Sequence, residues 1–156
     1  MRFINYPVKA DVTLTYDSLN RLLTASEATF GMVSFDYKPY GPLDYEDNNQ
    51  WPNSRVSYAY DSNRLRNGLT LAQPGGNWTQ GYHYDNAWRL DTVSGSSGTF
   101  SYGYESPSPW VHTISLPNSG SIRRNPDSVG RLQETLLRNA GGTTLNRHYY
   151  ELTFWR

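Results

Sequence analysis

The chain has no cysteine, no long apolar run and no excess of charge of either sign. Its 156 residues are of one-domain size. The absence of cysteine excludes disulfides and thiol catalysis. Fourteen Lys and Arg residues balance fourteen Asp and Glu residues, so no electrostatic signal points to nucleic acid or to an anionic membrane. No segment approaches the run of about twenty apolar residues that a spanning helix needs.

Aromatic residues are abundant instead. They make up 15% of the chain, and thirteen of them are tyrosine. Aliphatic residues are modest in number, so we expect a core of rings with isolated Leu, Val and Ile. Such a core suits a thin sheet better than a thick globule.

One short stretch recurs along the whole chain. Gly81-Tyr82-His83-Tyr84-Asp85-Asn86-Ala87-Trp88-Arg89-Leu90 has related copies at residues 14–22, 55–65 and 127–132. With the residue before the acid as a marker, the copies fall at positions 16, 37, 60, 84, 104, 126 and 150. The steps between them are 21, 23, 24, 20, 22 and 24 residues. A period near 22 residues indicates a repeat architecture.

Each repeat reads as a β-hairpin. Tyr82 and Tyr84 alternate with smaller or polar residues, so both rings lie on one face of an extended strand. The acid that follows is typical of a turn, because its carboxylate accepts hydrogen bonds from backbone just ahead. Asn20 and Gly130, three residues after their acids, are suited to a left-handed conformation. Arg-Leu then begins the return strand.

The expected repeat positions occur in several copies. They are Tyr16, Asp17, Arg21, Tyr58, Tyr60, Asp61, Arg64, Tyr82, Tyr84, Asp85, Arg89, Tyr102, Tyr104, Asp127, Gly130 and Arg131. We expect the four arginines Arg21, Arg64, Arg89 and Arg131 to pair with turn carboxylates. Five of the seven residues that stand two places before a marker are apolar or aromatic, which favours one continuous buried face.

The pattern Tyr-x-Tyr-Asp-x-x-Gly/Asn-Arg-Leu at this period resembles the YD repeat of RHS-repeat proteins, found in bacterial polymorphic toxins, toxin-complex subunits and teneurins. The resemblance covers nearly the whole chain. It implies tandem antiparallel hairpins in a curved sheet, part of a hollow β-shell that can enclose a toxic polypeptide. Trp88 and Lys38 depart from the pattern, and Glu105–Pro109 lacks its turn chemistry. Lys38-Pro39-Tyr40-Gly41 lacks the acid of the family's self-cleavage motif, so self-cleavage is not implied.

The fold class expected is therefore all-β, a single repeat array over residues 1–156. A parallel β-helix is the alternative, disfavoured by the hairpin turn signals inside each repeat. Residues 38–54, rich in Pro and Gly and holding the acidic cluster 44–47, are expected to form the longest loop. Residues 132–139 have helical propensity, but their place in the repeat favours a strand. A strand is also expected over 144–154.

No set of polar residues points to catalysis, and no metal or cofactor is expected. The four turn aspartates could be imagined as glycosidase acids, but equivalent turns spread them along one rim. His83, His112 and His148 are too dispersed to bind a metal ion together. The sequence contains no Gly-x-Ser-x-Gly elbow and no Gly-rich phosphate loop. We therefore expect a protein that is not an enzyme.

Two functions remain open. The chain is either a wall segment of an RHS-like shell that encases or presents a toxin or effector, or a module that binds carbohydrate or a cell surface. The second requires outward rings, and Trp51, Trp88 and Trp110 in expected loops or turn tips are its candidates.

The ends of the chain and its surroundings give further expectations. The last residues are strand-like and uncapped, so we expect either a piece of a longer repeat array that pairs with further repeats or a small degenerate array that self-associates through its ends. The N-terminus lacks a signal peptide's apolar stretch, so any export signal is expected elsewhere. The parent protein is expected to be extracellular or on a cell surface.

Overall fold

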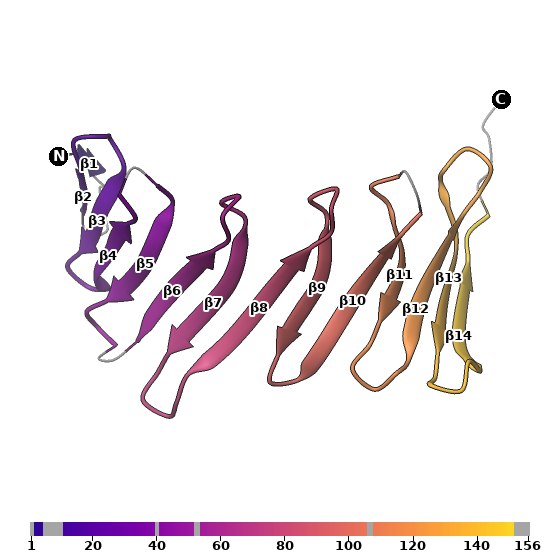
Figure 1. Ribbon diagram of the computed structural model, residues 1–156. Helices are drawn as coiled ribbons and strands as arrows, with labels where there is room; N and C mark the ends of the chain where they lie inside the picture. Colours follow the sequence, from indigo (N-terminus) through magenta and orange to yellow (C-terminus); the bar gives the residue numbers. More distant parts are fainter. Residues whose placement is uncertain (1, 5–10, 40, 52–53, 106–107, 152–156) are drawn as a thin grey trace. The chain divides into compact units, whose positions relative to one another are not determined.

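The computed structural model describes residues 2–4, 11–39, 41–51, 54–105 and 108–151. The chain divides into two compact units, residues 1–80 and 81–156. All regular structure in the described residues is β-strand, in fourteen strands (Figure 1). Among these residues no helix is long and apolar enough to cross a membrane.

The first unit is an antiparallel sheet in which sequence order is also spatial order. Its strands are β1 (Arg2–Ile4), β2 (Val12–Tyr16), β3 (Leu22–Glu27), β4 (Gly31–Tyr37), β5 (Leu43–Asn48), β6 (Arg55–Tyr60) and β7 (Arg66–Ala72). Each strand pairs antiparallel with the next, from β1 through β7. The strand β8 (Trp78–Tyr84) crosses the boundary between the units.

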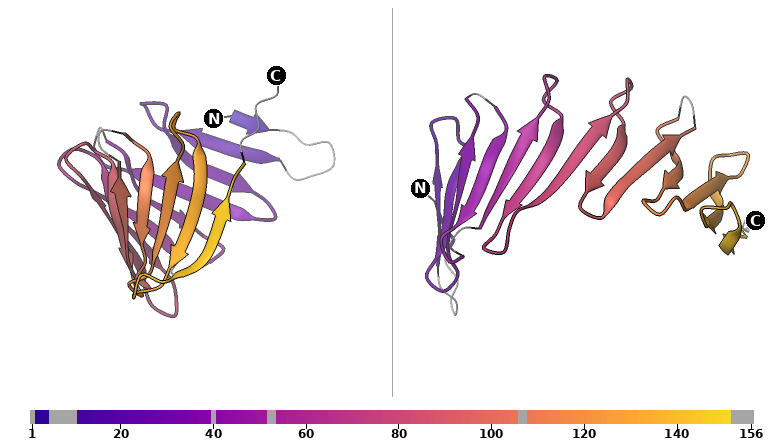
Figure 2. Two further views of the ribbon diagram at one scale, coloured as in Figure 1. Left: turned by 90° about the vertical axis from the view of Figure 1, so that its right-hand side faces the viewer. Right: turned by 60° about the horizontal axis from the view of Figure 1, so that its bottom comes forward.

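The second unit repeats this plan. Its strands are β9 (Leu90–Gly95), β10 (Gly98–Tyr104), β11 (Val111–Ser115), β12 (Ser121–Pro126), β13 (Leu132–Arg138) and β14 (Thr144–Tyr149). Consecutive strands are again antiparallel neighbours. Figure 2 shows each unit as a single twisted layer of strands. The prediction of tandem antiparallel hairpins in a curved all-β sheet is confirmed.

The two faces of the first sheet differ in chemistry, because side chains alternate between faces along each strand. Cross-strand partners place small hydroxyl residues together on one face, where the Thr15 and Thr24 hydroxyls are 2.6 Å apart. The apolar face is formed by Leu14, Ala25, Val33, Phe35, Val56, Tyr58, Leu69 and Leu71. The second unit has the same division, with Val93, Phe100, Tyr102, Ile114, Ile122 and Leu137 on its apolar face.

The prediction of a continuous buried face is wrong for the described residues. Leu136, 7% exposed, is the one buried hydrophobic side chain among them, and most strand residues have intermediate exposure. The reason is geometric: a single layer of sheet has no second layer to cover either face.

The prediction of a long loop over residues 38–54 is also wrong, because β5 lies inside it. Backbone bonds from Lys38 N–H to Pro42 O (3.0 Å) and from Gly41 N–H to Lys38 O (2.9 Å) form a tight turn. Neighbouring side chains compensate the acidic residues of β5. Lys38 pairs with Asp44 (2.8 Å), and Arg55 pairs with Asp47 (2.8 Å).

Two other segments were better anticipated. Residues 132–138 form β13 rather than a helix, as the repeat pattern indicated. The strand expected over 144–154 ends at Tyr149, and residues 152–156 lie outside the described part of the chain.

Candidate functional site

The recurring Tyr-Asp turns lie along one edge of each sheet, and their aspartates bond to the backbone in the same way in every copy. In the first, Asp17 Oδ1 accepts hydrogen bonds from the N–H groups of Leu19 (2.9 Å) and Arg21 (2.8 Å). The same pair of bonds, from the residues two and four places on, occurs at Asp61, Asp85 and Asp127. Two backbone hydrogen bonds close each loop. The Asp N–H donates to the carbonyl of the residue four places on, and the N–H of the residue three places on donates to the Asp carbonyl.

The residue three places after each acid adopts a left-handed conformation. This holds for Asn20 (φ 61°), Gly130 (φ 82°) and, against residue preference, Arg64 (φ 66°) and Trp88 (φ 63°). A non-glycine residue pays a steric cost there. The φ values at Asn20 and Gly130 agree with the turn chemistry expected from the sequence.

Hydrogen bonds lower the pKa of three of the turn carboxylates, Asp17, Asp85 and Asp127. The Arg21 N–H bond lowers the pKa of Asp17, with further help from the Arg21 side chain. The Arg89 backbone and side chain do the same for the pKa of Asp85. Burial opposes the effect at Asp127, yet its bonds to the Arg131 backbone and side chain hold the pKa below the ordinary value.

Three of the four predicted arginine pairs form. The Nε atoms of Arg21, Arg89 and Arg131 donate to the second carboxylate oxygen of Asp17, Asp85 and Asp127, at 2.6, 2.8 and 2.8 Å. The prediction for Arg64 is wrong. Arg64 stands three residues after Asp61, in the left-handed position, and Leu65 occupies the fourth place where the other arginines stand.

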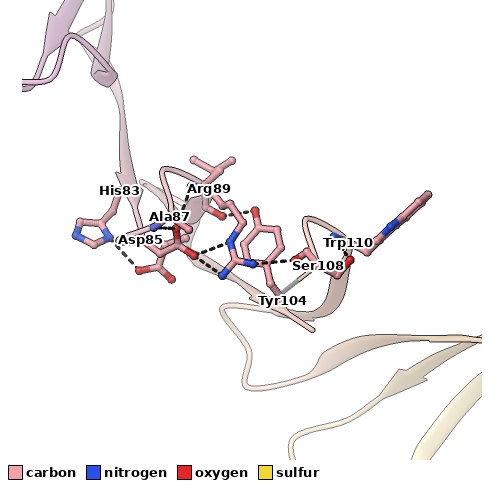
Figure 3. Close-up of polar contacts among 9 residues, drawn as sticks. His83, Asp85, Ala87, Arg89, Tyr104, Ser108 and Trp110 are labelled. Carbon is pink, nitrogen blue, oxygen red and sulfur yellow. Dashed lines mark hydrogen bonds and ion pairs between the residues drawn. The ribbon is translucent and has the colours of Figure 1, made fainter. Parts of the chain in front are cut away.

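The arginine also reaches the next hairpin. Arg89 Cζ lies 4.3 Å from the ring centroid of Tyr104, and Arg89 Nη1 donates to Ser108 O at 2.8 Å. Figure 3 shows the guanidinium between the Asp85 carboxylate and the Tyr104 ring. Arg21 makes the equivalent contacts with Tyr37 (4.4 Å) and Gly41 O (3.1 Å). We call this set of contacts the inter-hairpin clamp.

The marker tyrosine completes the clamp. The hydroxyls of Tyr37, Tyr60 and Tyr104 donate to the carbonyls of Leu22, Leu43 and Leu90 at 2.9, 2.9 and 2.7 Å. Each acceptor begins the return strand of the preceding hairpin. A register shift occurs directly before the marker in five copies, at Tyr16, Tyr37, Tyr60, Tyr104 and Pro126. Such bulges re-aim a side chain.

Sequence reasoning missed the clamp. It assigned the tyrosines to a buried face and paired the arginines with turn carboxylates, within or between repeats, rather than with the tyrosines. The sequence did carry a signal for it: the turn arginine of one repeat is followed, in the next repeat, by the marker tyrosine.

The clamp tyrosine is missing in the repeat after Tyr104, as the clamp arginine is missing after Asp61, where Leu65 takes its place. The next marker is Pro126, which has no hydroxyl, and the Glu105 loop is one residue longer than the others because Tyr104 pairs with Val111. Ser108 N–H donates to Glu105 O (2.6 Å) in that loop, and residues 106–107, on which the expected loss of turn chemistry falls, lie outside the described residues.

A pocket of about 480 Å³ lies where the clamp is missing. Its apolar lining comes from Trp110, Val111, Pro126 and Leu132, and its polar lining includes Glu105, His112, Arg124 and Asp127. Trp110 is 70% exposed and points away from the Arg89 clamp in Figure 3. The buried Nδ1 of His112 has no hydrogen-bond partner among the described residues.

The other two tryptophan candidates lie elsewhere. Trp88 is 57% exposed at the tip of the Asp85 turn, whereas Trp51, 69% exposed, lies at the opposite edge in the first unit. Within the second unit, Trp88 is not among the residues that line the pocket beside Trp110. The described residues hold no group of three or more His, Asp or Glu side chains that could bind a metal ion.

Comparison with known proteins places the fold. The chain has the tandem-hairpin fold of the RHS/YD-repeat shells. It is similar to the crystal structures of TcdB2-TccC3-TEV, with 18% identity and a TM-score of 0.52, and of TcdB2-TccC3-Cdc42, with 17% identity and a TM-score of 0.53. These alignments cover 92% and 90% of this chain but 10% of each matched chain. No family model and no curated protein matches the sequence.

Proposed function

We propose that the chain is a non-catalytic wall segment of an RHS/YD-repeat shell, which encloses or presents a toxin or effector domain of an exported protein. The observation that carries the proposal is the inter-hairpin clamp. Its arginine and tyrosine side chains hold consecutive hairpins together, which is a structural role. The fold shared with TcdB2-TccC3, a toxin complex with an RHS/YD shell, supports it. A wall also accounts for sheet faces that are only half-buried, since its faces would be covered by cargo or by further shell.

A wall segment should join other strands through its edge. In the described residues β14 pairs with β13 on one side only, and Leu145 on this strand is 62% exposed. An unpaired strand edge favours pairing with another chain. We expect light scattering over a concentration series to show a mass that grows with concentration.

The variant Leu145→Lys should reduce this growth, since charge on an edge strand opposes pairing. Phe30→Lys is the matched control: Phe30 is 77% exposed but lies in the turn between β3 and β4. A mass that stays monomeric at every concentration would contradict the wall proposal, as would equal effects of the two variants.

One observation favours a second function, the binding of carbohydrate. The pocket at the interrupted clamp combines an exposed indole with two carboxylates, and ligand pockets typically pair apolar walls with a few polar groups. A sugar ring would stack on Trp110 while its hydroxyls bond to Glu105 and Asp127. We expect a glycan array to retain a ligand that Trp110→Ala releases. Trp51→Ala, at equal exposure, should keep the ligand; no retained glycan would reject this function.

A further inference from the structure

The polar face of the second unit changes from small hydroxyl residues to charged ones at β12, β13 and β14. Cross-strand partners set Arg123, Leu136 and Arg147 in one row across these three strands. Asn125 and Glu134 stand opposite each other in the row on one side. On the other side, Arg138 stands between Ser121 and Thr144. An open groove of about 500 Å³ is lined by Arg123, Asn125, Glu134, Leu136, Arg138, Thr144 and Arg147, and we call it the arginine groove.

The groove carries a local excess of positive charge in a chain that is neutral as a whole. Three arginines face one carboxylate, which leaves two positive charges uncompensated within the groove. Glu134 forms an ion pair with Arg147 and accepts a hydrogen bond from Asn125 Nδ2 at 2.6 Å. Arg123 Nε donates to the neutral amide oxygen of Asn125 at 3.1 Å. The charges of Arg123 and Arg138 are therefore the surplus.

Two features prepare these arginines for an anion. The Nε of Arg138 is buried and has no hydrogen-bond partner among the described residues, and an unsatisfied buried donor is costly. Leu136, between the two arginines of its row, is the most buried hydrophobic residue described. Long arginine stems cover apolar surface in this way while their charged ends face solvent, which gives the groove an apolar floor and a cationic rim.

We propose that the arginine groove binds the carboxylates of an acidic polypeptide segment. The guanidinium group matches a carboxylate in a bidentate arrangement, and the open groove across three strands suits an extended peptide. Two surplus charges suit a few carboxylates better than a nucleic acid, whose binding draws on many phosphate contacts. This inference stands independently of the wall function.

The test uses the full chain and a fluorescently labelled oligoglutamate peptide, followed by fluorescence anisotropy at low ionic strength. We expect saturable binding that weakens as salt is added. The two neighbouring arginines of β12 supply a matched pair of variants, because Arg123 lies in the groove and Arg124 on the opposite face. Arg123→Gln should weaken binding by about tenfold, as expected when one charge-assisted hydrogen-bonding partner is lost, and Arg124→Gln should leave it unchanged.

A third variant guards against loss of folding. Glu134→Gln removes the groove's only carboxylate and should strengthen peptide binding while circular dichroism shows an unchanged sheet. Equal losses in Arg123→Gln and Arg124→Gln would overturn the proposal, as would an absence of saturable binding. Tighter binding of inorganic phosphate or of a single-stranded oligonucleotide than of the peptide would overturn the assignment to a polypeptide.

Discussion

The guanidinium of Arg89 lies over the ring of Tyr104, its Cζ 4.3 Å from the centroid, although the two residues belong to consecutive hairpins. The same arginine pairs with Asp85 in its own turn and donates to Ser108 O beyond the ring. The Arg89 side chain thus connects the turn of its own hairpin with the marker tyrosine and the following loop of the next hairpin. This explains in physical terms why Tyr, Asp and Arg recur together at a fixed spacing.

Replacement of the clamp arginine tests this connection. Arg89→Lys keeps the positive charge but loses the planar group that stacks on Tyr104 and reaches Ser108. We expect the free energy of unfolding to fall by about 1 kcal/mol, measured by urea denaturation. Arg64→Lys, in the turn where Leu65 occupies the clamp position, should change it by no more than about 0.5 kcal/mol.

The backbone at Trp88 predicts a substitution that raises the free energy of unfolding. Trp88 has φ 63°, a conformation that glycine adopts without steric cost. Trp88→Gly should raise the free energy of unfolding by about 0.5–1 kcal/mol. The neighbouring Ala87→Gly should lower it by a similar amount, because Ala87 is not among the described residues with positive φ. Thermal unfolding of the two variants would show shifts in opposite directions, and destabilisation by Trp88→Gly would contradict the strain argument.

The turn carboxylates predict sensitivity to acid. The pKa values of Asp17, Asp85 and Asp127 in the folded state lie below the ordinary value of 3.8. The unfolded chain therefore takes up protons first as the pH falls. The stabilisation is complete above pH 3.8 and is lost as the pH drops through the folded-state pKa values.

Unfolding followed by circular dichroism between neutral pH and pH 2 should show this loss. Asp85→Asn should flatten the acid dependence. Asp36→Asn, on the polar face outside any turn, is the control that should leave it steep.

Tyr58 predicts a loss of stability at high pH. Burial and the hydrogen bond to Glu46 (2.8 Å) raise the pKa of Tyr58 to about 12 from an ordinary value of 10.0. Between these values the unfolded chain releases a proton that the folded chain keeps. The stabilisation is therefore full below pH 10 and disappears as the pH rises toward 12. Tyr58→Phe should reduce the steepness of alkaline unfolding; an unchanged profile would contradict the assigned pKa.

The hairpins were predictable because each repeat carries its own turn. The Asp at the first turn position and Asn20 or Gly130 three residues on specify the loop locally, and the order Tyr-x-Tyr specifies the strand before it. Strand β5 was not predictable on these grounds. Pro39, Gly41, Pro42 and four successive polar or acidic residues indicate a loop, and only cross-strand partners such as Arg55 and Tyr58 show how the acids are compensated.

The clamp and the arginine groove depend on register, which the repeat period does not give. A bulge directly before Tyr16, Tyr37, Tyr60 and Tyr104 re-aims the tyrosine, and its position is not encoded in any single residue type. The assignment of Arg64 failed for a different reason: Arg64 stands three residues after Asp61, in the left-handed position, whereas the other three arginines stand four residues after their acids. The groove needs three strands in a specific register before Arg123, Arg138 and Arg147 face one another.

A double-mutant cycle between Arg89 and Tyr104 tests the central claim most directly, that the clamp couples consecutive hairpins. The cycle compares Arg89→Leu, Tyr104→Leu and the double variant by urea denaturation. We predict a coupling free energy of about 0.5–1 kcal/mol. Additivity within about 0.3 kcal/mol would show that the two side chains act separately, and would contradict the account.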